Sequence, residues 1–282
     1  DGALSSSFLI VGNGDPRCST TIIAGNERVV RARLDDAKFF YEEDLKRPLE
    51  DYVGKLDVVV FQEKLGTTGD KVRRMVKLAG SLAEDAGLSD EQHDLCERAA
   101  KLCKADLVTN AVVEFTSQQG VMGGYYARAS HEPEEVACAI EQHYRPRFAG
   151  DAVPENTVGK VVAFADKIDT ICGIFAVGQA PTGSSDPFAL RRAALGCISI
   201  LQSGLNVSLS RAISFELDQL DFLSFDRAQV ESDVRAFFSM RLTVIARDAG
   251  NDAKVVAAVL STGHVQPDDV LARCASLSRA RD

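Results

Sequence analysis

The sequence predicts a mainly α fold with a small β element near the N-terminus. Three observations support this fold class. Apolar residues recur at helical spacing along most of the 282 residues, glycines stand where these periodic stretches stop, and β-type runs occur only near the start. Hydrophobic residues make up 45% of the chain and charged residues 26%, a composition that allows a packed core in a globular protein.

The first elements are predicted as a β-hairpin followed by a helix. Phe8–Val11 and Thr20–Ile23 are short β-type runs, and the turn-rich stretch Gly12–Pro16 joins them. A helix is predicted from about residue 27 to residue 45, because apolar side chains recur there on one face. Pro48 ends this helix.

Helical periodicity continues from Val58 onward, is interrupted at Gly66–Gly69, and resumes as far as Gly87. Further helices are predicted at residues 90–113, 133–144, 156–176, 187–203, 227–248, 252–261 and 268–280. The expected C-terminal stops of three of them are Gly204, Gly250 and Gly263. We interpret the glycine-rich stretch Gly120–Tyr126 as a tight crossing between helices or a loop.

These elements predict three regions. Residues 1–55 are the end of an α+β body region, residues 56–204 are a helical domain, and residues 205–282 are a helical connector. The first boundary is placed near Pro48 and Gly54, and the second at the cluster of Ser, Gly and Asn in residues 203–212.

Charge and composition narrow the classes of partner. The net charge of −9 weighs against a broad basic surface, so we expect no DNA partner and only local contacts with RNA. No apolar run of about 18 residues occurs, and no membrane span is expected. The seven cysteines include no C-x-x-C pair, which favours reduced thiols and a cytoplasmic location. Because the chain begins at Asp1, we expect it to start inside a larger polypeptide.

The stretch Pro181–Gly196 is the most informative segment. Asp186 is predicted to cap a helix whose first residue is Pro187. The buried face of this helix is predicted to consist of Leu190, Ala194, Ile198 and Leu201. Arg191 and Arg192 flank that face, either as solvated charges or as contacts to a phosphate or carboxylate.

This segment and several others, in the same order, resemble the β subunit of the heterotetrameric bacterial glycyl-tRNA synthetase. The matching strings are Gly25–Tyr41, Phe61–Thr67, Lys104–Leu107, Tyr144–Asp151, Ala165–Thr170 and Pro181–Gly196. The resemblance covers most of residues 8–200 and is weak beyond about residue 205.

The resemblance implies that the whole enzyme joins glycine to its tRNA with ATP and magnesium. It places the adenylate-forming site in the α subunit and gives the β subunit tRNA binding and assembly. This chain would then be a central, non-catalytic part, and its C-terminal connector would lead toward an anticodon-binding domain. The implied partners are glycine tRNA and the α subunit.

The helices after about residue 58 also resemble a degenerate HD-type domain, the fold of metal-dependent phosphohydrolases. Such enzymes hold divalent ions with imidazole and carboxylate ligands from separate helices. Here His143 and Asp166 match the later ligand positions, but Phe61–Lys64 replaces the first histidine and Lys104 stands at the His-Asp pair. We therefore expect no catalytic residue and no metal in this chain.

Alternatives remain open at these positions. His143 is equally explained as a hydrogen-bonded core residue, and Asp166 and Asp169 as hydrogen-bond acceptors or partners of arginine. The pair His93-Asp94 lies early in its predicted helix, where a capping region is the simpler interpretation. A metal-dependent phosphohydrolase and a purely structural helical scaffold are the alternative functions.

Arginines are the candidate contacts to tRNA, because the planar guanidinium can donate two parallel hydrogen bonds to a phosphate. Salt bridges within the chain are the competing explanation. The candidates are Arg28, Arg31, Arg33, Arg145, Arg147, Arg191 and Arg192.

Overall fold

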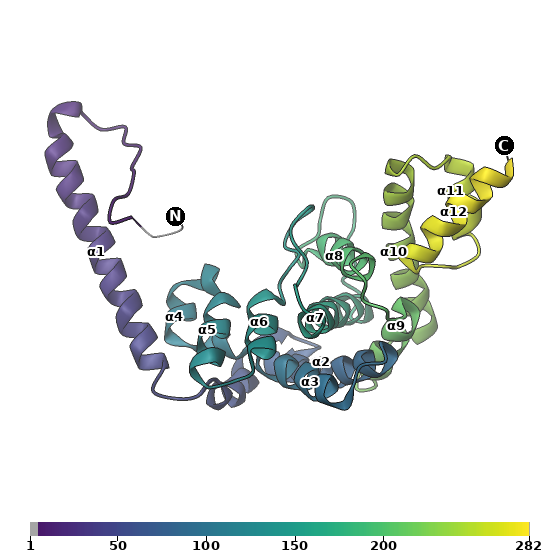
Figure 1. Ribbon diagram of the computed structural model, residues 1–282, viewed down its shortest axis with the longest axis horizontal. Coiled ribbons are helices and arrows are strands. Elements are labelled where there is room, and N and C mark those ends of the chain that lie inside the picture. The colour runs from purple at the N-terminus through teal and green to yellow at the C-terminus, as the bar shows by residue number, and fades with distance from the viewer. Residues whose placement is uncertain (1–4, 282) are drawn as a thin grey trace. The chain divides into compact units, whose positions relative to one another are not determined.

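The structure is a computed structural model that describes residues 5–281. The chain divides into two compact units, Asp1–Lys46 and Arg47–Asp282, and each is described by itself (Figure 1). The region boundaries predicted after residues 55 and 204 stay predictions.

The fold is mainly α, as predicted. The α-helices are α1 (Ser19–Asp44), α2 (Thr68–Asp85), α3 (Asp90–Leu102), α4 (Asn110–Glu114), α5 (Val121–Ala129), α6 (Glu134–Gln142), α7 (Thr157–Ala176), α8 (Leu190–Gln202), α9 (Leu209–Asp218), α10 (Arg227–Asp248), α11 (Ala253–Leu260) and α12 (Pro267–Arg281). Short 3₁₀ helices are η1 (Pro16–Cys18), η2 (Leu49–Val58), η3 (Ala105–Val108) and η4 (Thr116–Gln118). The strands are β1 (Val60–Gln62) and β2 (Gly66–Thr67).

The N-terminal unit contains a long helix where a hairpin was predicted. Residues 8–11 form no strand, and residues 20–23 are the first turns of α1, so both predicted strands are wrong. Asp15 accepts a hydrogen bond from the backbone N–H of Arg17 at 2.9 Å and starts η1, which leads directly into α1. A β-branched run indicates a strand only when a partner strand is available, and this unit supplies none among its described residues.

The small β element lies instead in the second unit. Strand β1 pairs antiparallel with β2, and Gly66, the first residue of β2, has a φ of 85°, which favours glycine. The side chain of Gln62 closes this turn by accepting hydrogen bonds from the N–H groups of Lys64 at 2.7 Å and Leu65 at 3.0 Å. The predicted fold class is confirmed, with its β element at residues 60–67.

Helix α7 is the central element of the second unit. It lies among the other helices of this unit (Figure 1) and packs against α2, α3, α6, α8, α9 and α10. Nearly every one of its side chains is buried. A helix that is buried on nearly all sides has neighbours on all sides. The remaining helices α11 and α12 pack on α10 and on each other. Side chains that α7 directs outward therefore meet the inner faces of several other helices.

Several predicted helix boundaries are confirmed. Helix α10 spans the predicted residues, and the glycines that end α8, α10 and α11 have φ values of 96°, 89° and 81° at Gly204, Gly250 and Gly263. The predicted helix 90–113 is broken after Leu102 by the turn into η3. Within the described residues, no helix combines the length and apolar character needed to span a membrane.

Two helices lie where none was predicted. Helix α9 occupies part of the predicted linker, and Ser208 caps it by accepting from the N–H of Arg211. Helix α5 occupies the glycine-rich stretch, where a crossing was one of the two interpretations. A Cβ on Gly123 would lie 2.8 Å from Ile140 of α6, so the close crossing of α5 and α6 depends on that glycine.

The start of α8 differs from the prediction. The helix begins at Leu190, so Pro187 lies outside it. Asp186 still accepts hydrogen bonds from the first-turn N–H groups of Leu190 at 2.8 Å and Arg191 at 2.9 Å, across a loop rather than from the adjacent capping position. The four residues of the predicted apolar face are all buried.

Candidate functional site

A cluster of ionisable side chains, most of them charged, is buried around α7, and we call it the buried ion cluster. Its members are Lys71, Arg74, Lys104, His143, Asp166, Asp169 and Glu216. They come from α2, the turn before η3, the C-terminal end of α6, α7 and α9. Buried charges are stable only when they are paired and hydrogen-bonded, so the pairing within this cluster determines its chemistry.

Lys104 lies at the centre of the positions that resemble metal ligands. Its Nζ donates to Asp166 Oδ2 at 2.9 Å and lies 2.9 Å from His143 Nε2. Burial opposes the charge of this ammonium, but the Asp166 carboxylate together with the neighbouring Tyr144 and Cys103 outweighs burial and raises the pKa of Lys104. The lysine therefore stays protonated at neutral pH and supplies the positive charge between the two side chains.

His143 is a neutral imidazole in this arrangement. Its Nδ1 lies 2.6 Å from the carbonyl oxygen of Ile140, an acceptor, so Nδ1 carries the proton. Nε2 is then free to accept from Lys104. Burial and the adjacent ammonium lower the pKa of His143 well below its usual range. This histidine is a hydrogen-bonded core residue, as one of the two alternatives stated.

Asp166 and Asp169 are paired with cations from α2. Lys71 Nζ lies 3.0 Å from Asp166 Oδ1 and 2.7 Å from Asp169 Oδ2, and Arg74 Nε donates to Asp169 Oδ1 at 2.6 Å. Burial alone would raise the pKa of Asp166, but Lys104 and Lys71 lower it well below its usual range. Asp166 is thus ionised, and the carboxylates of both aspartates are engaged with cations.

Glu216 behaves differently from the two aspartates. It is completely buried, and burial together with the nearby Asp169 carboxylate raises its pKa well above the usual range. Its closest cation, Arg74, has its Nε 3.6 Å away and is already bound to Asp169. The environment of Glu216 therefore favours the protonated carboxyl.

The buried ion cluster does not fit a divalent metal ion. Among residues 5–281, no group of three or more His, Cys, Asp and Glu side chains is arranged to hold one. The physical reason is the position of Lys104, whose ammonium contacts both His143 and Asp166 and would repel a second cation. The cluster also leaves no ionised carboxylate unpaired, so it offers no general base.

Asp106, two residues after Lys104, accepts hydrogen bonds at the start of α5 and so holds that helix in place. Its Oδ2 accepts from the N–H groups of Gly120 at 2.6 Å and Gly123 at 3.0 Å at the start of α5. Burial raises the pKa of Asp106 to about 6, although these two N–H groups and Lys104 favour the ionised form.

The predicted arginines fall into separate places. Arg28, Arg31 and Arg33 are exposed on α1 in the N-terminal unit. In the second unit, Arg145 lies 3.7 Å from Glu155, and Arg191 donates to the carbonyl oxygen of Gly183 at 2.7 Å.

Arg147 and Arg192 are brought together. The guanidinium of Arg192 donates to the backbone carbonyl of Arg147 at 3.3 Å, and both side chains line a pocket of about 380 Å³ beside the buried ion cluster. Asp166 and Lys167 form part of the same wall. The structure thus brings two of the candidate tRNA-contact arginines close to Asp166, one of the positions that resemble metal ligands.

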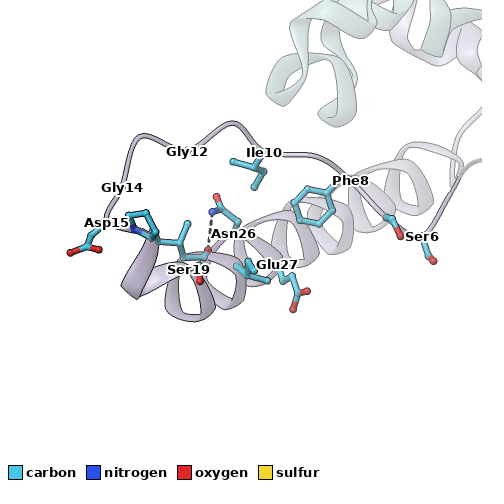
Figure 2. Close-up of a pocket in the computed structure, with 13 residues that line it drawn as sticks. Ser6, Phe8, Ile10, Gly12, Gly14, Asp15, Ser19, Asn26 and Glu27 are labelled. Carbon is cyan, nitrogen blue, oxygen red and sulfur yellow. Dashed lines mark hydrogen bonds between the residues drawn. The ribbon is translucent and has the colours of Figure 1, made fainter.

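A second pocket, of about 510 Å³, lies in the N-terminal unit (Figure 2). Figure 2 shows the extended segment before α1 running back along the first turns of that helix, with Ile10 beside Asn26 and Phe8 farther along the helix. Its acidic members are Asp15, which is bound to Arg17, and Glu27. The lining contains no nucleophile paired with a base, so we assign no chemistry to this pocket.

Sequence reasoning missed Lys71, Arg74 and Glu216. Lys71 and Arg74 are three residues apart on α2, and both lie on the buried side of that helix. The sequence signal that could have identified Lys71 and Arg74 was the presence of two cationic residues on a helix face that is otherwise apolar. The pair His93-Asp94 lies in the first turns of α3, which Ser89 caps, and takes no part in the cluster.

Comparison with known proteins agrees with the resemblance. The family model described as glycyl-tRNA synthetase beta subunit matches residues 1–261. Proteins named glycine–tRNA ligase beta subunit are 46% identical over 279 residues in Clostridioides difficile, covering 99% of this chain, and 44% identical over 282 residues in Pasteurella multocida, covering 100%. The chain spans 40% of the length of each of these relatives. The chain therefore belongs to the glycyl-tRNA synthetase beta subunit family.

Proposed function

We propose that this chain is the non-catalytic central part of the β subunit of glycine–tRNA ligase. It binds glycine tRNA and supports assembly with the α subunit in the cytoplasm. The complete enzyme uses ATP and magnesium to join glycine to the tRNA, at an adenylate-forming site in the α subunit. Membership of the family supports the assignment to glycine–tRNA ligase, and the buried ion cluster supports the non-catalytic role of this chain.

The observation that carries this proposal is the position of Lys104. A phosphohydrolase of the HD type needs ligands that leave open positions for water on a divalent ion. Here the ammonium of Lys104 bonds to His143 and Asp166, and Lys71 bonds to Asp166 from the other side. The cluster instead ties α2, α6 and α7 together, which is the work of a scaffold.

The arginines supply the RNA contact. The net charge of −9 disfavours diffuse binding of a polyanion, so contact must be made through local groups of positive charge. Arg28 and Arg31 lie one helical turn apart on the exposed side of α1, at a spacing that presents both to one phosphate strand. Binding through phosphates weakens as salt rises, because counterions are released.

A titration of glycine tRNA tests the proposal. The wild-type chain is compared with a variant in which Arg28, Arg31 and Arg33 are alanine, at two salt concentrations. Each phosphate contact contributes about one to the slope of log affinity against log salt, so loss of the Arg28 and Arg31 contacts should lower the slope by about two. Arg247→Ala removes one charge from the exposed face of α10 and serves as the control, with tRNA affinity unchanged.

The outcomes separate the possible roles. Equal tRNA binding by the wild type and the triple variant removes the RNA assignment for α1. Absence of tRNA binding by the wild-type chain, even with the α subunit present, favours the purely structural scaffold.

A further inference from the structure

The pocket beside the buried ion cluster has the composition of a nucleotide site. It lies where the end of α6 and the segment after it meet α7 and the start of α8. The lining residues that bear on its chemistry are Tyr144, Arg147, Asp166, Lys167, Phe188 and Arg192. Its volume of about 380 Å³ falls within the range of about 300–1,000 Å³ that small-molecule sites occupy.

The pocket carries excess positive charge. Its one carboxylate, Asp166, is already neutralised by Lys104 at 2.9 Å and Lys71 at 3.0 Å. Among the described residues, the guanidinium of Arg147 has no ion-pair partner, and that of Arg192 donates only to a backbone carbonyl. Two guanidinium groups with unused donors therefore line a space whose one acid is already paired with lysines, which suits a phosphate.

Lys167 adds a further cation to the same wall. Its Nζ donates to the carbonyl oxygens of His143 at 3.3 Å and Arg145 at 2.8 Å. Burial lowers the pKa of Lys167 to about 8, which leaves most of it protonated at neutral pH. Gly196 provides the space for this side chain, because a Cβ there would lie 2.8 Å from the lysine Cε. The cation is thus fixed in position in the lining of the pocket.

Aromatic side chains form the other part of the lining. The ring of Tyr144 is fixed, since the Lys104 ammonium lies 3.9 Å from its centroid and the His143 ring centroid also lies 3.9 Å away. Phe188 is partly exposed in the loop that precedes α8. A partly exposed ring beside phosphate-binding groups provides a stacking surface for a base.

We propose that this pocket binds a nucleoside phosphate, with Arg147 and Arg192 on the phosphate and Phe188 against the base. If the proposed function holds, the nucleoside phosphate in the pocket is an unpaired nucleotide of bound tRNA, and in this respect the inference rests on the proposed function. A free mononucleotide offers the same chemistry, and the experiment distinguishes the two. A fully paired duplex does not fit, because its bases are stacked inside the helix.

A tryptophan reporter tests the pocket directly. The chain contains no tryptophan, so Phe188→Trp introduces a single indole at the proposed stacking surface. The variant is titrated with AMP, with a short single-stranded RNA, with a blunt RNA duplex of the same length and with glycine tRNA, and indole fluorescence is recorded. Phe222→Trp places the indole on another exposed phenylalanine and is the matched control.

The expected result is quenching of the Phe188→Trp signal by AMP and single-stranded RNA, little effect of the duplex, and no quenching in Phe222→Trp. Adding Arg147→Ala and Arg192→Ala should weaken the single-strand affinity about tenfold or more, because two charge-assisted contacts are lost. Both arginines are exposed, so these changes leave the core intact. Arg247→Ala in the same background should leave the affinity unchanged.

The outcomes are distinct from those that test the proposed function. Quenching by RNA but not AMP identifies tRNA as the source, and quenching by AMP in a chain that does not bind tRNA keeps the pocket while refuting the proposed function. Quenching by neither ligand overturns the inference, even if the chain binds tRNA elsewhere. Equal affinity after removal of both arginines also overturns it.

Discussion

Replacement of Lys104 by methionine is the most informative perturbation of the buried ion cluster. Methionine keeps an unbranched apolar stem of similar length and removes the ammonium. The change eliminates the 2.9 Å bond to Asp166 and the 2.9 Å contact with His143 Nε2. Asp166 keeps Lys71 at 3.0 Å, whereas His143 Nε2 loses its donor.

The expected cost follows from these contacts. Leaving a buried acceptor without a partner costs about 1–3 kcal/mol, and removing one partner of a buried ion pair costs about 3–5 kcal/mol. Because Lys71 still neutralises Asp166, the lower part of that range applies, and we predict a loss of about 3 kcal/mol. For a unit of this size, a change of that magnitude lowers Tm by about 6–12 °C.

The pH dependence provides a second readout. The pKa of Asp166 is depressed in the folded chain, so its contribution is present above the ordinary value of 3.8 and is lost as the pH falls through the folded value. Without Lys104 the depression is smaller, and acid unfolding should begin at a higher pH. The raised pKa of Lys104 means that its own contribution is complete below pH 10.5 and is lost only in stronger alkali.

Urea unfolding followed by circular dichroism, at neutral pH and across the acid range, measures both effects. Lys254→Met is the control, because Lys254 is exposed and lies outside the cluster. A Lys104→Met variant that is as stable as the wild type, with the same acid transition, would refute the argument that this ammonium stabilises the cluster.

Two further substitutions test neighbouring features. Glu216→Gln should stabilise the chain by at least about 1 kcal/mol more at pH 8 than at pH 4. The reason is that the raised pKa of Glu216 makes the wild type lose stability as the pH rises above 4.5, whereas glutamine does not titrate. Urea unfolding at the two pH values checks this prediction, and equal effects at both would contradict it. Gly123→Ala should destabilise the folded chain by about 1–3 kcal/mol, because the new Cβ would lie 2.8 Å from the Ile140 side chain. Gly54→Ala is the control and should be nearly neutral, because nothing lies within 4 Å of a Cβ at that position. Thermal unfolding of the two variants decides between these expectations.

Helix existence could be predicted where capping and periodicity agree. Helix α10 follows Asp226, which caps it by accepting from the N–H of Gln229, and ends before Gly250. Helix α9 carried the same kind of signal in Ser208 and the apolar positions that follow it, but the surrounding Ser, Gly and Asn favoured a linker. The β-branched run Thr20–Ile23 was misleading because a strand needs a partner, whereas a helix satisfies its own backbone.

The candidate site could be predicted only in part. His143 and Asp166 were identified through resemblance, and Lys104 was recognised as unfavourable for a metal. Which cation neutralises Asp166 depends on α2 packing against α7, a contact between residues about a hundred positions apart that no local pattern specifies. The approach of Arg147 to Arg192 likewise depends on the tertiary structure.

The central claim is that lysine ammonium groups take the place of a metal ion, so that the helical scaffold handles RNA and does not hydrolyse phosphoesters. Titration of the wild-type chain with Mn²⁺, followed by electron paramagnetic resonance, tests it most directly. We predict that the spectrum remains that of free aqueous Mn²⁺, with the same result for His143→Ala. Stoichiometric Mn²⁺ binding that disappears in His143→Ala would contradict the claim.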